Sequence, residues 1–150
     1  MLAAAVCALW VVYMYQADAA EHFGPYRADV IDVSDGDTIK MLAHKWPDDP
    51  QIVRIRLNGV NTGETKNSGR YRPEFCELID GFDAWHFTER FLESRQITID
   101  RVRFGAYPRR MVADVYADGE SLANALLESG LAMKSNKDGS RKSWRCNSDY

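Results

Sequence analysis

The order of strand-like and helix-like segments predicts an α+β protein built on a small five-stranded antiparallel β-barrel of the OB type. Asp-Gly pairs at 35–36 and 118–119 stand at the ends of runs rich in β-branched residues, which is typical of tight turns next to strands. One helix-like segment is inserted before the fourth predicted strand, and a C-terminal helix follows the fifth. A chain of 150 residues suits one domain with a single core.

The first three strands are predicted from a hairpin and from alternating side chains. Residues 28–43 are typical of two strands joined at the first Asp-Gly pair. In residues 51–57, QIVRIRL, apolar side chains alternate with Arg54 and Arg56. Both arginines are therefore expected to project from one face of the sheet.

Residues 75–95 have apolar side chains at helical spacing and predict a long helix. Gly81 lies inside this segment and costs about 1 kcal/mol relative to alanine, which makes it a candidate break. The spacing suggests two apolar stripes: Leu78, Phe82 and Trp85 in one, and Ala84, Phe87 and Phe91 in the other.

The last part of the chain predicts two strands, a short helix and an irregular tail. Residues 96–102 and 110–119 supply the fourth and fifth strands, and residues 120–130 form an amphipathic helix with Gly130 as its C-terminal cap. From about residue 133 the chain is predicted to be irregular and basic.

The N-terminus differs in composition from the rest of the chain. Residues 2–15 are apolar and uncharged but short for a membrane span, which needs about 20 residues, and Ala17-Asp18-Ala19 fits a small-residue cleavage site. Residues 1–19 are therefore predicted to be a signal peptide, with an uncleaved membrane anchor through residues 2–15 as the alternative. The remaining domain, residues 25–150, is expected to be a periplasmic or secreted monomer without stable membrane association.

Charge and cysteine usage limit the possible ligands and redox state. The net charge of −3 excludes a strong global positive field, so a polyanion would need local positive charge. Cys76 and Cys146 remain as an even pair in an oxidising compartment after Cys7 leaves with the signal peptide. We predict a Cys76–Cys146 disulfide, with two free buried thiols as the alternative.

Three polar segments carry side chains suited to phosphodiester hydrolysis: DGDT at 35–38, RLNGVNTGE at 56–64 and YPRRMVADVYADG at 107–119. That reaction needs a hard cation held by oxygen ligands, positive groups over the phosphate and a group that acts on water. Asp37 suits the cation. Arg56 and Arg110 are suited to bind the phosphate, and Glu64 is suited to act on the water.

These motifs, in this order, resemble the staphylococcal nuclease (thermonuclease) family. The family pattern is DGDT, an arginine five residues before D-T/A-P-E, and Y-G-R-x-L-A followed by a strand and D-G. The resemblance runs from about residue 29 to 132, and ESLANALLESGLA is similar to the family's final helix. Cys76 and SWRC at 143–146 are similar to an arrangement in exported bacterial members, which favours the predicted disulfide.

The resemblance implies a role for each matching residue. Asp37 matches a calcium-ligand aspartate, and Thr62 matches a threonine whose carbonyl group approaches the metal. Arg56 and Arg110 match the two arginines that contact phosphate. Glu64 matches the glutamate usually assigned as general base.

The sequence departs from the family pattern in the loop that carries Glu64. Asn61 stands in place of a second calcium-binding aspartate; its amide oxygen can still ligate Ca²⁺, but with one negative charge fewer it should bind the ion more weakly. Gly63 replaces a proline and is expected to loosen the loop. Pro108-Arg109 replaces the Tyr-Gly pair that precedes the second arginine.

The function implied is an exported calcium-dependent nuclease with a weakened metal site, acting on single-stranded DNA or RNA. Asn61 and Gly63 motivate the alternative of a catalytically inactive module of the same family that binds nucleic acid. A secreted structural protein is a third reading. Each motif also has a plain structural reading, in which DGDT is a hairpin turn and the two arginines are surface salt-bridge partners.

Overall fold

A computed structural model describes residues 22–45, 48–67, 71–105, 110–135 and 144 of the chain. The predicted signal peptide, Tyr107 with its neighbours, most of the basic tail and Cys146 lie outside these residues. Within the described ranges, no helix is long and apolar enough to cross a bilayer.

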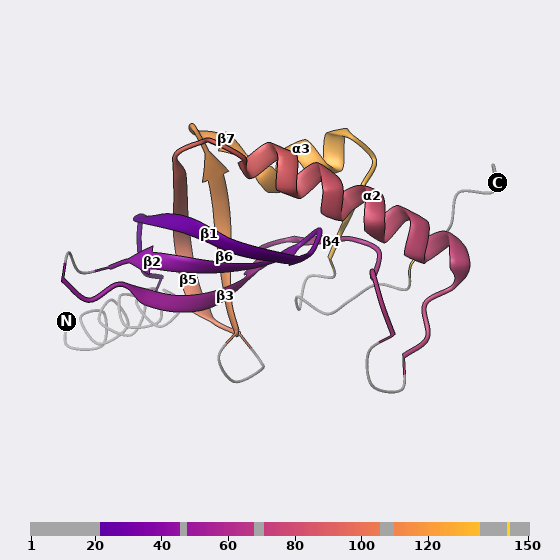
Figure 1. Cartoon of the computed structure of the whole chain (residues 1–150), viewed down its shortest axis with the longest axis horizontal. Coiled ribbons are helices and arrows are strands. Elements are labelled where there is room, and N and C mark those ends of the chain that lie inside the picture. Colours follow the sequence, from indigo (N-terminus) through magenta and orange to yellow (C-terminus); the bar gives the residue numbers. More distant parts are fainter. Residues whose placement is uncertain (1–21, 46–47, 68–70, 106–109, 136–143, 145–150) are drawn as a thin grey trace, which may run out of the picture.

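Five strands form a closed barrel, as the sequence predicts (Figure 1). The sheet runs in the order β3-β2-β1-β5-β6, a direct β3–β6 pairing closes the ring, and the short strand β7 pairs antiparallel with the end of β6. These strands are β1 (Tyr26–Asp35), β2 (Thr38–His44), β3 (Gln51–Leu57), β5 (Ile97–Phe104), β6 (Arg110–Ala117) and β7 (Glu120–Ser121). The OB-type α+β architecture is thereby confirmed.

The expectation of a purely antiparallel barrel is wrong at the closing pair. β3 and β6 are parallel, with Arg54 opposite Arg110 and Leu57 opposite Ala113. The reason is geometric. Each of the other four neighbouring pairs is antiparallel, and strand direction cannot alternate all the way around a ring with an odd number of members.

Alternation along the strands places the core inside the barrel. The inward-facing side chains of Ile39, Met41, Ile55, Ile99 and Val115 are almost completely buried. The two helices lie together on one side of the barrel, with α2 against β1 and α3 against β6 (Figure 1). This side is where the turn between β1 and β2 meets α2.

Helix α2 (Phe75–Leu92) is continuous through Gly81. The predicted stripe that included Phe82 is wrong, because 48% of Phe82 is exposed. The buried residues of the helix are Glu77, Gly81, Ala84, Thr88 and Leu92, four of which are small or polar. The predicted stripe of Ala84, Phe87 and Phe91 does pack against the core.

Helix α3 (Leu122–Glu128) is capped at both ends. The hydroxyl group of Ser121 accepts a hydrogen bond from the Asn124 amide at 3.3 Å, and Gly130 has a φ of +71°, as its predicted capping role requires.

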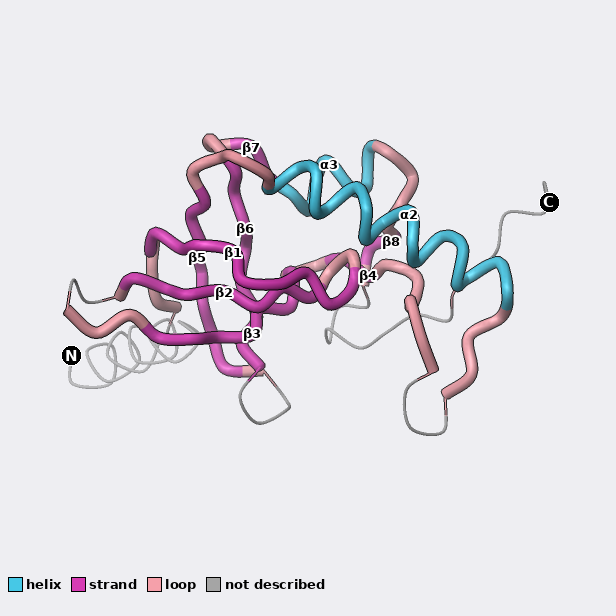
Figure 2. Tube along the Cα trace, in the orientation of Figure 1, coloured by secondary structure: helices cyan, strands magenta, loops and turns pink. Residues whose placement is uncertain are grey.

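The start of the tail is ordered, contrary to the prediction that it is irregular. β8 (Met133–Lys134) pairs with β4 (Val60–Asn61), so that Asn61 lies opposite Met133 (Figure 2). The Ser135 amide also donates a hydrogen bond to the Gly59 carbonyl at 2.9 Å. The chain after α3 therefore fixes the backbone of a predicted site residue.

Candidate active site

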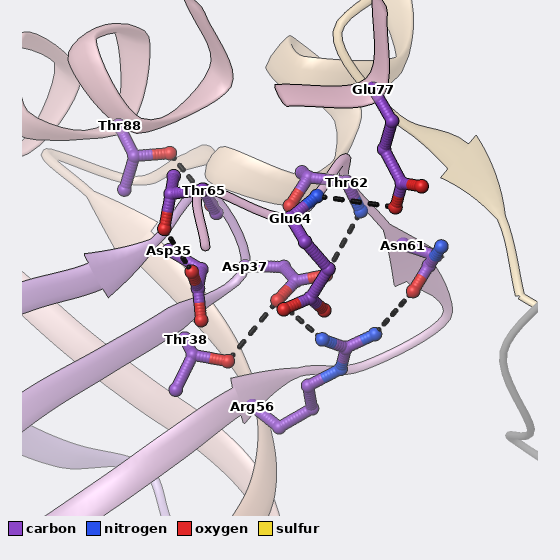
Figure 3. Close-up of polar contacts among 11 residues, drawn as sticks. Asp35, Asp37, Thr38, Arg56, Asn61, Thr62, Glu64, Thr65, Glu77 and Thr88 are labelled. Carbon is purple, nitrogen blue, oxygen red and sulfur yellow. Dashed lines mark hydrogen bonds and ion pairs between the residues drawn. The ribbon is translucent and has the colours of Figure 1, made fainter. Parts of the chain in front are cut away.

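Four of the predicted site residues meet where the turn before β2, strand β3 and strand β4 converge (Figure 3). Thr38 lies opposite Arg56 in the β2–β3 pairing, which brings Asp37 next to the end of β3. The Leu57 amide donates to the Asp37 carbonyl at 2.9 Å and holds the two segments together. Asn61 then follows β3 after a tight turn.

Asp37 is a buried carboxylate, with only 1% of the residue exposed. It accepts an ion-paired hydrogen bond from Arg56, one from the Thr62 amide at 2.9 Å and one from the Thr38 hydroxyl group at 3.1 Å. Burial raises the pKa of Asp37 above its ordinary value, and the Arg56 charge and the Thr62 amide offset that rise only in part. These contacts favour the charged form that a cation ligand needs.

Arg56 bridges the two side chains that were predicted to share a cation. One end of its guanidinium group binds Asp37, and Nη2 donates to Asn61 Oδ1 at 2.7 Å. Because these bonds use only part of the donor capacity of a guanidinium group, Arg56 can also bind a phosphate.

Two buried polar atoms at the site have no hydrogen-bond partner within the described part of the chain: Asn61 Nδ2 and Thr62 Oγ1. Leaving such an atom unsatisfied costs about 1–3 kcal/mol. Asn61 and Thr62 are almost completely buried, so this cost is not relieved by bulk water. Such groups call for an explanation, such as strain, a catalytic role or a bound water or ion.

The donor set fits a hard cation in kind but carries little charge. Side-chain oxygens of Asp37 and Asn61 lie on either side of Arg56, and oxygen ligands are what Ca²⁺ prefers. Of these three residues, Asp37 alone has a carboxylate. Among the described residues no group of three His, Cys, Asp or Glu side chains could hold a metal.

Glu64 is held over the same guanidinium group by its backbone. Figure 3 shows its carboxylate directed toward Arg56. The Glu64 amide donates to Glu77 Oε1 at 3.4 Å, and the Glu77 carboxylate also accepts a hydrogen bond from the Tyr71 hydroxyl group. Glu77 lies buried in the first turn of α2, so the helix anchors the loop.

Gly63 and Gly81 allow the loop and helix α2 to approach closely. A Cβ atom on Gly63 would lie 2.6 Å from the Glu77 carbonyl oxygen, and one on Gly81 would lie 2.5 Å from the Glu64 carbonyl oxygen. Neither position has room for a side chain. The structure therefore gives Gly63 a packing role, rather than the loosening role expected from the sequence.

The turn that carries Asp37 is also fastened to α2. Thr88 Oγ1 donates to the Gly36 carbonyl at 2.7 Å, and Thr65 Oγ1 donates to Asp35 at 2.7 Å. Sequence reasoning missed Glu77 and Thr88. Their only signal is their helical spacing from Gly81 and Ala84, which a search for apolar stripes overlooks.

Arg110 lies on the same sheet face as Arg56 but not in the Asp37 network. Arg110 is the first residue of β6 and lies opposite Arg54, whereas Arg56 lies opposite Val112. Arg110 is therefore one row of side chains away from Arg56. The residues just before it, including Tyr107, lie outside the described part of the chain.

The fold and the cluster together define a class of protein, an OB-type barrel with an arginine, a buried aspartate and a glutamate at one end of the barrel strands. The model of the staphylococcal nuclease homologue family matches residues 54–146, more than half of the chain, and the chain belongs to this family. The family is one of nucleases, which are hydrolases of nucleic acid. Five of the six predicted site residues lie within the match, and Asp37 precedes it.

Proposed function

We propose that the protein is a calcium-dependent nuclease that hydrolyses phosphodiester bonds of single-stranded DNA or RNA. One observation carries the proposal. Arg56 binds the side chains of Asp37 and Asn61, and the carboxylate of Glu64 is directed toward the same guanidinium group. Cation ligands, a phosphate-binding arginine and a carboxylate base are the parts that this reaction needs.

Glu64 acts as the general base in this proposal. Its carboxylate accepts a proton from the water that attacks phosphorus, and the attack displaces the bridging oxygen. Glu77 and the Gly63–Gly81 contact fix the Glu64 backbone, which limits the positions that the carboxylate can sample.

Arg56 and Arg110 stabilise the negative charge that develops on the phosphate oxygens. A guanidinium group matches phosphate in a bidentate geometry. Before calcium and substrate arrive, Arg56 is held at the site by Asp37 and Asn61. Arg110 approaches the phosphate from the neighbouring row.

A calcium ion would be held by the side-chain oxygens of Asp37 and Asn61 and by the Thr62 carbonyl group. When bound, it would polarise the phosphate and offset its charge. The amide of Asn61 in place of a carboxylate should make this site weak, since ligand charge sets calcium affinity.

A second function is a binding module of the same family that holds single-stranded nucleic acid without cleaving it. Asn61 is the observation that favours it, because the buried set contains a single carboxylate. In this reading Arg56 and Arg110 bind phosphate, and no hydrolysis follows.

We further propose that residues 1–19 are a signal peptide, that the mature protein is periplasmic or secreted, and that Cys76 and Cys146 form a disulfide. Trp144 supports the pairing. Its indole Nε1 donates to Asp80 Oδ2 at 2.9 Å, which brings a residue two positions before Cys146 to the first turns of α2, where Cys76 lies.

The test is cleavage of end-labelled single-stranded DNA and RNA by the oxidised protein, in chelator and in calcium from micromolar to tens of millimolar. The isosteric variant Asp37→Asn serves as the metal-site control. The proposal expects cleavage in calcium, none in chelator and a large loss in Asp37→Asn. Salt-dependent binding without cleavage at any calcium concentration would instead establish the binding module.

A further inference from the structure

Three basic residues lie side by side on the outward face of the barrel. Lys40 of β2 lies directly opposite Arg54 of β3, and Arg54 lies opposite Arg110 of β6. Their chain neighbours Ile39 and Ile55 are fully buried, so the basic side chains point away from the core. We call Lys40, Arg54 and Arg110 the basic row.

This arrangement works against the stability of the sheet. Like charges directly opposite one another on a sheet destabilise it. Within the described part of the chain, neither Lys40 nor Arg54 makes an ion pair or a side-chain hydrogen bond. Two other arginines, by contrast, have acidic partners: Arg101 pairs with Asp114, and Arg95 pairs with Glu120.

The basic row is continuous with the candidate active site. Arg56 lies two residues beyond Arg54 on the same strand and projects from the same face. Two residues of strand advance about 7 Å, similar to the separation of successive phosphates along an extended single strand. Arg103 extends the positive face beside Arg56, because it lies opposite Val112 and its guanidinium group donates to the neutral Asn58 amide at 2.9 Å.

One acidic residue borders the row. Asp32 of β1 lies opposite Lys40, is exposed and accepts a hydrogen bond from Ser34 at 3.2 Å. It stands at the end of the row farthest from Arg110 in the sheet order. The centre of the row therefore keeps its positive charge.

We propose that Lys40 and Arg54 of the basic row form a phosphate-binding subsite, which holds the backbone of a single-stranded nucleic acid next to the phosphate bound at Arg56 and Arg110. The inference rests on the proposed function for the identity of the polyanion. It explains how a chain with a net charge of −3 can bind a polyanion. It also assigns a role to Arg54 and Lys40, which the active-site cluster does not use.

The test uses the double variant Lys40→Gln/Arg54→Gln, with Arg90→Gln as a matched control. Arg90 is an exposed cation on helix α2, away from β2 and β3. Binding of a fluorescent oligothymidylate of about twelve nucleotides is measured by anisotropy in chelator, where no calcium supports cleavage, at several salt concentrations. Thermal unfolding of each variant is recorded in parallel.

We expect the double variant to bind about tenfold more weakly. The slope of log affinity against log salt should be shallower by about 1.4, since each phosphate contact with a single strand contributes about 0.7. The defect should vanish for a dinucleotide, which is too short to reach both Arg56 and the row. The melting temperature should stay equal or rise, because like charges are removed.

An unchanged salt slope in the double variant, or an equal loss in Arg90→Gln, would overturn the proposal. Binding to anionic lipid vesicles with no binding to the oligonucleotide would also overturn it. A protein that shows the expected slope change but never cleaves DNA would retain the subsite and lose the proposed catalysis, so the two failures are distinguishable.

Discussion

At the scale of single residues, Arg56 lies at the centre of the Asp37, Asn61 and Glu64 cluster. It binds the same Asp37 and Asn61 oxygens that would hold a cation, and it lies beneath the Glu64 carboxylate. The guanidinium group therefore has a second role besides phosphate binding. It also supplies the positive charge that keeps a buried aspartate stable in the fold.

Removal of that charge should destabilise the protein in a way that calcium and acid can reverse. In chelator we expect Arg56→Ala to lose about 3 kcal/mol of unfolding free energy, because Asp37 is left as an unpaired buried carboxylate. Calcium should recover part of the loss by binding the native state.

The pH dependence of this variant has a definite sign. Burial already raises the pKa of Asp37, and removal of Arg56 removes an opposing charge, so the folded-state pKa rises further above the unfolded value. The penalty should therefore shrink as pH falls and Asp37 takes up a proton. Urea unfolding of parent and variant at several pH values, with and without calcium, measures it. A penalty that is constant across pH would contradict this electrostatic origin.

Asn61 should set how much calcium the protein needs. We expect Asn61→Asp to bind calcium at least tenfold more tightly, because it adds a negative charge to the ligand set. In chelator the same variant should be less stable than the parent, since a second carboxylate is then buried beside Asp37. Isothermal titration calorimetry gives the affinity directly. Equal affinities in the two proteins would show that Asn61 is not a ligand.

Much of the site was predictable residue by residue. Asp37, Arg56, Asn61 and Thr62 meet as the motifs indicate, because short-range turns connect them to neighbouring strands. Glu77 and Thr88 were not predictable, because each acts through a backbone group brought close by the packing of α2.

At the scale of elements, the loop with Glu64 and helix α2 behave as one unit. Their backbones touch at Gly63 and Gly81, so the loop position depends on the absence of two side chains. The family pattern has a proline where this chain has Gly63. In this chain a proline ring would collide with the Glu77 carbonyl group.

We therefore expect both Gly63→Ala and Gly63→Pro to lose stability, by about 1–3 kcal/mol, as forced overpacking does elsewhere. Both should also lower the cleavage rate, since Glu64 is displaced. Lys66→Ala, an exposed change in the same loop, is the control and should leave both properties unchanged. Thermal unfolding and cleavage rates measure the effects. A Gly63→Pro variant that is more stable and more active would contradict the close-packing account.

The long elements could be predicted from the sequence, whereas the short ones could not. The β1–β2 hairpin, β3 and α2 were predicted because each carries its own turn signal or periodicity. The two-residue strands β4 and β8 have no period to detect, and they exist only because the chain after α3 returns to Asn61. The buried face of α2 was predicted only in part, because Glu77, Gly81 and Thr88 line it together with the predicted apolar residues Ala84, Phe87 and Phe91.

At the scale of the whole molecule, the closing β3–β6 pair does two things. It completes the barrel, and its parallel register places Arg54 beside Arg110. The sequence showed an outward-facing arginine pair on β3 but not which strand would lie next to it. The basic row is therefore a property of barrel closure.

The proposed disulfide would tie the tail to α2 and close a loop of nearly half of the chain. The chain-entropy model gives a loop of this length about 4 kcal/mol of stabilisation. Reduction of the parent should lower its unfolding free energy by a similar amount, and Cys76→Ser should match the reduced parent and not respond to reductant. Denaturant unfolding with and without reductant measures both. Two titratable thiols in the oxidised, unfolded protein would exclude the bond.

The central claim is that the cluster at Arg56 is a working hydrolase site with Glu64 as its base. The most direct measurement is the single-turnover rate of cleavage of a short single-stranded oligonucleotide in saturating calcium, by the parent and by Glu64→Gln. We expect the parent to cleave and the variant to be slower by about 10²–10⁴-fold, with unchanged oligonucleotide affinity. Equal rates in the two proteins, or no cleavage by the parent, would contradict the claim.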